Sequence, residues 1–232
     1  MSNAITPIHA VLFDLDGTLL DTAPDLISAL NNLLEHYDRA SVDFEKLRNL
    51  ASQGSVALTR YGFPEVTDDI QFEKLRQEFL QHYAQCVCVD SKLFNGMKEL
   101  LETIEENDIP WGIVTNKPGD LTKSLLNKLS LPHQPACIVC GDTLKVRKPH
   151  PDPLLLASKT IQLSPHHTIY LGDDPRDIYA GNAAGMYTCV ARYGYIEPDI
   201  DTDQWGADFT INNPLELLTH IQLSTPINEM GT

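Results

Sequence analysis

Acidic residues gather at two places in the chain where their spacing could support chemistry. Asp14 and Asp16 are separated by a single residue, and Asp173, Asp174 and Asp177 lie together in a second short segment. Several ionised carboxylates are unfavourable beside one another, because each raises the pKa of its neighbours. A hard divalent cation relieves this repulsion, and Mg²⁺ prefers a few carboxylates together with waters and a phosphate oxygen. The aspartates therefore indicate a magnesium site, provided that the fold brings the two segments together.

One lysine and one threonine would complete such a site for a phosphate group. Lys148 stands between Arg147 and Pro149, and Thr115 follows an apolar run that ends at Val114. An ammonium group and a hydroxyl donor can bind the phosphate oxygens that a metal leaves free. A single aspartate at the end of a strand is often only a helix cap or a turn residue. The complete set, in this order along the chain, instead favours phosphoryl chemistry.

The elements that would position these residues are short apolar strands alternating with amphipathic helices. Six apolar runs are continuous, as in strands buried on both faces of a parallel sheet; they cover residues 9–13, 109–114, 137–140, 168–171, 187–191 and 208–211. Helical periodicity lies between most of them, and a weaker repeat at Leu215, Leu218 and Ile221 predicts a closing helix. The alternation predicts an α/β fold with a Rossmann-like parallel sheet. Ligands of such sheets bind beyond the carboxyl ends of the strands, where the acidic segments fall.

One segment interrupts this alternation. Between Thr22 and Lys92 the sequence has helical patterns and no convincing strand. Two apolar stripes at helical spacing run through the segment, one formed by Leu26, Ile27, Leu30, Leu33, Leu34 and Tyr37 and the other by Phe72, Leu75, Phe79 and Tyr83. We therefore expect a small helical domain, residues 22–92, inserted into an α/β core that consists of residues 1–21 and 93–232.

Composition limits the classes of function open to this chain. Its 232 residues contain 17 Lys and Arg against 32 Asp and Glu, a formal net charge of −15. Nucleic acids and anionic membranes are bound by basic surfaces, so we expect neither as a partner. No apolar run is long enough to span a bilayer. A signal peptide begins with a basic region, and no Lys or Arg precedes Arg39. The five cysteines are odd in number and sparse, which favours reduced thiols and a cytoplasmic protein.

With these motifs the chain resembles the haloacid dehalogenase superfamily of phosphatases. Residues 14–21 match the first motif of the superfamily, DxDGTLxD, and residues 114–116 match the second. Lys148 matches the third motif, and residues 172–174 together with Asp177 match the fourth. The resemblance spans the whole core, and the position of the helical insert is similar to that of a C1 cap. It implies Mg²⁺-dependent hydrolysis of a phosphomonoester through an aspartyl-phosphate.

The resemblance assigns the central chemistry to the aspartates of the first motif. Asp14 would attack phosphorus and become an aspartyl-phosphate, which divides a difficult hydrolysis into two easier steps. Asp16 would protonate the departing alcohol and then deprotonate the attacking water. Mg²⁺ would be held by Asp14, the backbone carbonyl of Asp16, and Asp173. Asp174 would either be a further metal ligand or support the metal ligands without contacting the metal itself.

The second, third and fourth motifs imply residues that hold the phosphate group. Thr115 and the backbone of Asn116 would bind phosphate oxygens together with Lys148. Asp177 would orient Lys148 or a metal-bound water. The resemblance thus places four further residues around the phosphoryl group that Asp14 attacks.

Residues beside these motifs have expectations of their own. Gly17 would allow the loop to turn tightly near the metal, and Thr18 would support that loop. Lys117, which follows the second motif, could help to attract the substrate, but we expect its side chain to be solvent-exposed. Residues 53–55 fall in a break between cap helices and could face the substrate, although Gly54 could equally be an ordinary helix-terminating residue.

Finer features are similar to those of phosphoglycolate phosphatases, namely residues 114–118, 148–151, 183–186 and 193–195. Residues 92–94, 111–113 and 205–208 resemble the branch that acts on N-acetylmuramic acid 6-phosphate. The implied partner is a small phosphorylated metabolite, bound by a monomer or a homodimer. Two other functions remain open: a phosphomutase, which passes the phosphoryl group to a sugar, and a non-catalytic binding module. Asp16 argues against the module, because a mere binder needs no acid or base.

Overall fold

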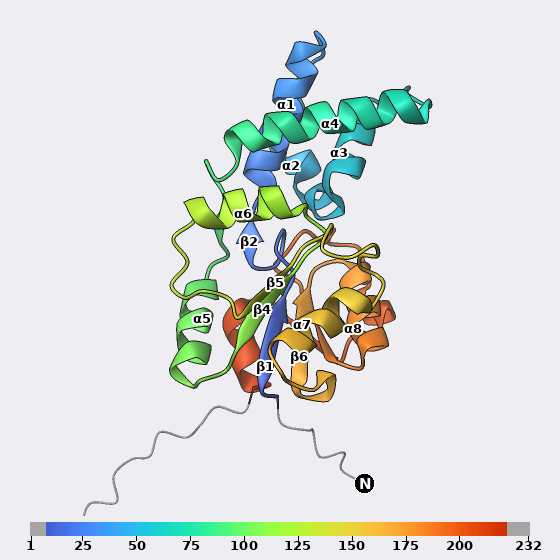
Figure 1. Cartoon of the computed structure of the whole chain (residues 1–232). Helices are drawn as coiled ribbons and strands as arrows, with labels where there is room; N and C mark the ends of the chain where they lie inside the picture. Colours follow the sequence, from blue (N-terminus) through green and yellow to red (C-terminus); the bar gives the residue numbers. More distant parts are fainter. Residues whose placement is uncertain (1–7, 222–232) are drawn as a thin grey trace, which may run out of the picture.

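The computed structural model describes residues 8–221 and shows a twisted parallel sheet with a helical cap above one edge (Figure 1). All neighbouring strands of the main sheet are parallel, in the order β5-β4-β1-β6-β7-β8. The strands are β1 (Ala10–Phe13), β4 (Trp111–Val114), β5 (Cys137–Val139), β6 (Thr168–Gly172), β7 (Tyr187–Ala191) and β8 (Phe209–Ile211). The predicted α/β fold with a Rossmann-like sheet is confirmed, and each strand lies within or beside its predicted apolar run.

The central strand β1 is apolar throughout because helices cover both faces of the sheet. Successive side chains of a strand point to opposite faces. Val11 and Phe13 accordingly join one buried cluster, whereas Leu12 joins a second cluster with Tyr170. Helix α5 (Met97–Glu106) contributes to the first cluster, and helices α7 (Asp152–Thr160) and α8 (Pro175–Ala184) contribute to the second. Burial of each large apolar side chain stabilises the fold by about 1.5–3 kcal/mol.

The cap consists of helices packed above the carboxyl ends of the strands (Figure 1). Its elements are α1 (Ala23–His36), α2 (Phe44–Leu47), the 3₁₀ helix η1 (Arg48–Gln53), α3 (Gly54–Gly62) and α4 (Asp69–Cys86). The two predicted apolar stripes lie in α1 and α4, which pack against each other; Leu30, Leu33, Phe79 and Tyr83 are fully buried. Tyr37, predicted as part of the first stripe, instead follows the end of α1 and is 39% exposed. Helix α4 begins where Asp68 accepts a hydrogen bond from the Gln71 N–H at 2.8 Å.

Two short strands connect the cap to the core. β2 (Leu20–Asp21) leads into the cap and pairs antiparallel with β3 (Lys92–Leu93), which leads back. The sequence analysis missed this pair, since two residues are too few to show an apolar pattern. The buried Asp25 carboxylate accepts hydrogen bonds from the backbone N–H groups of residues 89–91 and thereby holds the returning chain against α1. The predicted division into a core and a cap domain stays a proposal. The pairing of β2 with β3 supports it, because these strands lie at the two predicted domain boundaries.

The end of the described chain differs from the prediction. Residues Pro214–Thr219 form a 3₁₀ helix, η4, rather than an α-helix. Asn213 starts this turn by accepting a hydrogen bond from the Glu216 N–H, and Leu217 fills the apolar position beneath it while Leu215 is 41% exposed. The remaining helices are α6 (Gly119–Lys128), η2 (Pro165–His167) and η3 (Thr202–Trp205). Among residues 8–221, no helix has both the length and the hydropathy needed to cross a membrane.

Candidate active site

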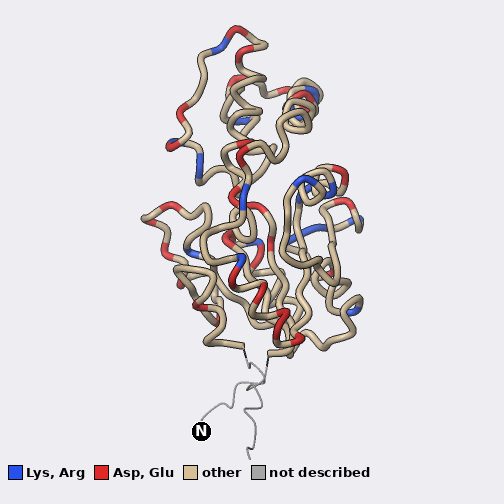
Figure 2. The backbone as a smooth tube through the Cα atoms, turned by 90° about the vertical axis from the view of Figure 1, so that its left-hand side faces the viewer, with Lys and Arg blue, Asp and Glu red and all other residues tan. Residues whose placement is uncertain are grey.

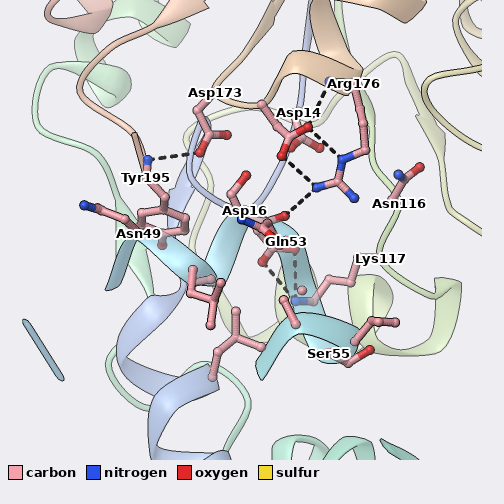
Figure 3. A pocket seen from close by; sticks show the side chains of 18 of the residues that line it. Asp14, Asp16, Asn49, Gln53, Ser55, Asn116, Lys117, Asp173, Arg176 and Tyr195 are labelled. Carbon is pink, nitrogen blue, oxygen red and sulfur yellow. Dashed lines mark hydrogen bonds and ion pairs between the residues drawn. The ribbon is translucent and has the colours of Figure 1, made fainter. Parts of the chain in front are cut away.

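The carboxyl ends of neighbouring strands bring the predicted site residues together. Asp14 follows β1 and its N–H donates to the carbonyl of Leu171 in β6 at 2.8 Å, so the ends of these strands are tied to each other. Asp173 follows β6, and Thr115 follows β4. Figure 3 shows Asp14, Asp16 and Asp173 facing a common pocket that cap residues close from the other side.

Lys148 occupies the centre of a buried ionic network. Its Nζ lies 2.7 Å from Asp14 Oδ1, 2.7 Å from Asp177 Oδ1 and 2.8 Å from the Tyr170 hydroxyl, and its side chain is 3% exposed. Burial by itself would lower the pKa of Lys148, but the attraction of the two aspartates raises it, so the lysine is a cation. The Asn116 side chain clamps the Lys148 backbone, since its amide donates to the Lys148 carbonyl at 3.0 Å and its oxygen accepts from the Lys148 N–H at 3.1 Å. No pattern in the sequence predicted this clamp.

Three buried carboxylates at this edge could hold a metal ion. One oxygen each of Asp14, Asp173 and Asp177 lies within 4.8 Å of the others. Burial raises the pKa of Asp14 to about 7, with Lys148 opposing the shift and Asp177 adding to it. Burial and the charges of Asp14 and Asp177 also raise the pKa of Asp173 well above its usual value. The cluster holds more negative than positive charge, so its residues fit a hard divalent cation.

The loop after β1 encloses Asp173. The Thr18 hydroxyl donates to Asp173 Oδ1 at 2.9 Å, and the Tyr195 N–H donates to Oδ2 at 3.0 Å. Gly17 adopts a φ of +89°, and a Cβ atom built there would lie 2.2 Å from Asp173 Oδ2. Both the backbone conformation and the close approach therefore require glycine at this position. Gly17 and Thr18 thus lie against a carboxylate of the cluster.

Asp16 lines the same pocket but is not a member of the three-carboxylate cluster. Its carboxylate accepts hydrogen bonds from Lys117 Nζ at 2.9 Å and from the Thr22 hydroxyl at 2.6 Å. The expectation that Lys117 is solvent-exposed is wrong, because Tyr83 of α4 covers the lysine and Asp16 compensates its charge. Burial would lower the pKa of Lys117, but Asp16 and Tyr83 raise it. The sequence reveals neither contact, since both depend on how the cap sits on the core.

Asp174 serves a different purpose from the neighbouring Asp173. Its side chain caps α8 by accepting from the Arg176 N–H at 2.8 Å, and it pairs with the Arg176 guanidinium at 2.7 Å. Asp177 completes a capping box by accepting from the Asp174 N–H. Asp174 therefore lies outside the three-carboxylate cluster, and its role toward a metal stays a prediction. Arg176, which the sequence analysis did not consider, also donates to the carbonyl of Ser52 in the cap at 3.0 Å.

A cavity of about 1310 Å³ lies between the cap and the carboxyl ends of the strands. Residues 53–55 line it, and Gly54, which ends η1 with a φ of +71°, has open space where a Cβ atom would stand. The segment therefore both ends η1 and lines the cavity, and contact with the substrate stays a prediction. Basic side chains also line the cavity in spite of the net charge of −15, among them Lys46, Arg60, Arg76 and Arg147. Figure 2 shows basic and acidic positions close together where the cap meets the core.

Comparisons with known proteins point to one family. The family model of the haloacid dehalogenase-like hydrolases matches residues 11–191. An N-acetylmuramic acid 6-phosphate phosphatase from Pseudomonas putida is 44% identical over 90% of this chain and 94% of its own length. A phosphoglycolate phosphatase from Xanthomonas campestris is 40% identical over 90% of this chain and 94% of its own. The crystal structure of a predicted phosphoglycolate phosphatase from Haemophilus somnus superposes with a TM-score of 0.80 at 25% identity, covering 93% of this chain and 99% of that one.

Proposed function

This chain belongs to the haloacid dehalogenase-like hydrolase family and is a phosphoric monoester hydrolase, and we propose that its substrate is N-acetylmuramic acid 6-phosphate. The size of the cavity carries this proposal. Pockets that enclose drug-sized ligands have volumes of roughly 300–1,000 Å³, and this cavity of about 1310 Å³ has room for an amino sugar with a lactyl ether. The two-carbon acid 2-phosphoglycolate would leave most of it to water.

The chemistry of the cavity walls fits the same substrate. Val56 and Tyr61 of the cap and Ile200 of the core line the cavity and are 42–48% exposed. Such apolar groups suit a sugar face and an acetamido methyl group. The exposed Lys46 and Arg147 also line the cavity and suit the lactyl carboxylate. A substrate with both apolar and anionic parts would use both kinds of wall.

In the first half of the proposed reaction, a carboxylate oxygen of Asp14 attacks phosphorus. The bond from phosphorus to the sugar oxygen breaks, and an aspartyl-phosphate forms. Asp16 gives its proton to the departing sugar oxygen, which leaves as an alcohol. Lys148, the Thr115 hydroxyl and the backbone of Asn116 bind the phosphoryl oxygens and reduce their negative charge during the transfer.

In the second half, Asp16 acts as a base. It removes a proton from a water molecule whose oxygen attacks phosphorus, and the bond between phosphorus and Asp14 breaks. Inorganic phosphate leaves, and both aspartates return to their starting states. The cap excludes other water from the site while the intermediate exists.

Mg²⁺ is the cofactor that we propose for this site. Asp14, the Asp16 backbone carbonyl and Asp173 would hold it, and it would supply positive charge to the phosphoryl oxygens. The excess negative charge of the buried cluster supports this assignment. Asp177 also belongs to the cluster, but its ion pair with Lys148 suits it to orienting that lysine.

Phosphate release from a panel of esters tests the proposed substrate. The panel contains N-acetylmuramic acid 6-phosphate, N-acetylglucosamine 6-phosphate as a matched sugar without the lactyl group, glucose 6-phosphate and 2-phosphoglycolate. We expect the highest kcat/KM for the first ester, at least about tenfold above the matched sugar, because a charged contact contributes about 1.5–3 kcal/mol. A higher kcat/KM for 2-phosphoglycolate would overturn the proposal in favour of the activity for which the Xanthomonas relative is named.

The same panel addresses the phosphomutase alternative. A phosphatase releases inorganic phosphate from one substrate without a bisphosphate activator, whereas a mutase returns the phosphoryl group to the sugar.

We propose a small phosphorylated metabolite as the partner of this chain. The predicted cytoplasmic location and the choice between monomer and homodimer stay predictions, which cell fractionation and light scattering would test.

A further inference from the structure

A buried lysine beside Asp16 has no part in the mechanism derived above. Lys117 lies between β4 and α6, and its backbone is fixed on both sides. Its N–H donates to Thr115 Oγ1 at 3.1 Å, and its carbonyl accepts from the Gly141 N–H at 2.9 Å. The side chain is 5% exposed and extends from this turn toward Asp16 (Figure 3). The fixed turn therefore determines where the ammonium group lies.

The ammonium group contacts both oxygens of the Asp16 carboxylate. Lys117 Nζ is 2.9 Å from Oδ1 and 3.2 Å from Oδ2. The Thr22 hydroxyl donates to Oδ1 at 2.6 Å and so holds that oxygen from the other side. With Thr22 alone, the carboxyl group could still rotate about the bond that joins it to Cβ. The contact of Lys117 with Oδ2 removes this freedom.

A residue of the cap holds the ammonium group in turn. Nζ lies 4.4 Å from the ring centroid of Tyr83, which belongs to α4 and is fully buried. A cation is attracted to the face of an aromatic ring, most strongly where water is excluded. Lys117 thus joins a reacting carboxylate of the core to an aromatic side chain of the cap.

We propose that Lys117 is a positioning residue for Asp16, a role that rests on the proposed function of Asp16 as acid and base. It holds the carboxyl group on the side of the phosphorus from which the alcohol departs, and Tyr83 keeps the ammonium group in place. A general acid must lie within hydrogen-bond reach of the oxygen that it protonates. Loss of Lys117 therefore slows the departure of an alcohol more than any other event at the site.

The dependence of kcat/KM on the leaving group tests this role. An alkyl phosphate needs a proton on its departing oxygen, whereas p-nitrophenyl phosphate releases a stable anion and needs little help. We expect Lys117→Met to lower kcat/KM about 10²-fold for alkyl phosphates and by less than about threefold for p-nitrophenyl phosphate. Lys117→Arg, which can still contact both carboxylate oxygens, should recover most of the loss.

Two controls separate positioning from stability. Lys128→Met removes another lysine near the cap, whose Nζ donates to the Val87 carbonyl at 3.0 Å but does not contact Asp16; it should leave both classes of substrate unchanged. In an Asp16→Asn background, Lys117→Met should cause no further loss, because a residue that acts through Asp16 has nothing left to position. Should Lys117→Met fail to fold, Tyr83→Leu replaces it and should show the same bias against alkyl phosphates.

Three other outcomes would reject the proposed role of Lys117. Equal losses for both classes of ester would show a general structural role for Lys117. A rise in KM confined to esters that carry a carboxylate would show that Lys117 binds the substrate. A full additional loss in the Asp16→Asn background would show that Lys117 acts independently of Asp16. If the unmodified enzyme releases no phosphate from any ester, the proposed function itself fails, which is a distinct result.

Discussion

Without divalent metal, the stability of this protein should fall as the pH rises. Burial raises the pKa of Asp14 from 3.8 to about 7, with Lys148 opposing the shift and Asp177 adding to it. Between these two pKa values the folded protein keeps a proton that the unfolded chain has lost. Stability decreases with pH wherever the folded state binds more protons than the unfolded chain. The stability associated with the Asp14 carboxyl group is therefore fully present below about pH 4 and is lost as the pH rises through about 7.

The expected change is large enough to measure by unfolding. Each pKa unit corresponds to 1.36 kcal/mol, so the free energy of unfolding should decrease by about 2.5 kcal/mol between pH 5 and pH 7. In a chain of this length, 1 kcal/mol shifts Tm by roughly 2–4 °C, which gives a decrease of about 5–10 °C. Asp173, whose pKa is also raised by burial, acts in the same direction. Saturating Mg²⁺ binds the ionised carboxylates and should remove the decrease.

Urea titrations at pH 5 and pH 7, with EDTA and with Mg²⁺, provide the assay. Asp14→Asn is the matched control, since the amide has nearly the same shape and is neutral at both pH values. With EDTA this variant should lose the part of the pH dependence that Asp14 contributes, about 2.5 kcal/mol between pH 5 and pH 7, and keep the part that Asp173 contributes. Equal stability of the metal-free protein at pH 5 and pH 7, or an unchanged pH dependence in Asp14→Asn, would show that Asp14 does not keep its proton in the folded protein.

Three further substitutions test other contacts of the site. Lys148→Met leaves two buried carboxylates unpaired and should cost about 3–5 kcal/mol of stability without metal, part of which Mg²⁺ should restore; an unchanged urea midpoint would contradict the network around Lys148. Gly17→Ala places a Cβ atom 2.2 Å from Asp173 Oδ2 and should raise the Mg²⁺ concentration needed for half-maximal activity about 5-fold to 150-fold, the equivalent of the roughly 1–3 kcal/mol that such strain costs; an unaltered Mg²⁺ titration argues against it. Arg176→Met removes the hydrogen bond to the Ser52 carbonyl of the cap and the ion pair with Asp174, and it should raise KM about threefold to tenfold with little change in kcat. A change confined to kcat would show that these contacts do not contribute to substrate binding.

The sequence was most informative where chemistry follows directly from a strand. Asp14 and Asp173 each come after a continuous apolar run, and parallel strands end at one edge, so their approach could be predicted without knowledge of any loop. The position of Lys148 was harder to predict on physical grounds, because no strand immediately precedes it. Its place depends on the Asn116 side chain, which clamps the Lys148 backbone through two hydrogen bonds. Such a clamp leaves no periodic signal in the sequence.

Contacts between cap and core were the least predictable part. Lys117 was expected to be exposed because lysine usually is, yet Asp16 and Tyr83 together bury it. The apolar stripe of α4 includes Tyr83 and predicts a buried ring, but it does not predict which core residue the ring covers. Arg176 was missed for the same reason, since its partner Ser52 lies 124 positions away in the cap. Interactions of this kind depend on how the cap helices are placed on the sheet, which periodicity within a single helix or strand does not report.

The proposed mechanism requires the Asp14 carboxylate to become phosphorylated during turnover. Rapid mixing with p-nitrophenyl phosphate and Mg²⁺, an acid quench and mass spectrometry of the digested protein test it most directly. The Asp16→Asn variant is best suited, because this ester needs no acid to depart whereas the intermediate needs a base to be hydrolysed. We predict that the peptide containing Asp14 gains one phosphoryl group. An unmodified Asp14 peptide during continuing phosphate release, or a phosphoryl group on another residue, would contradict the account.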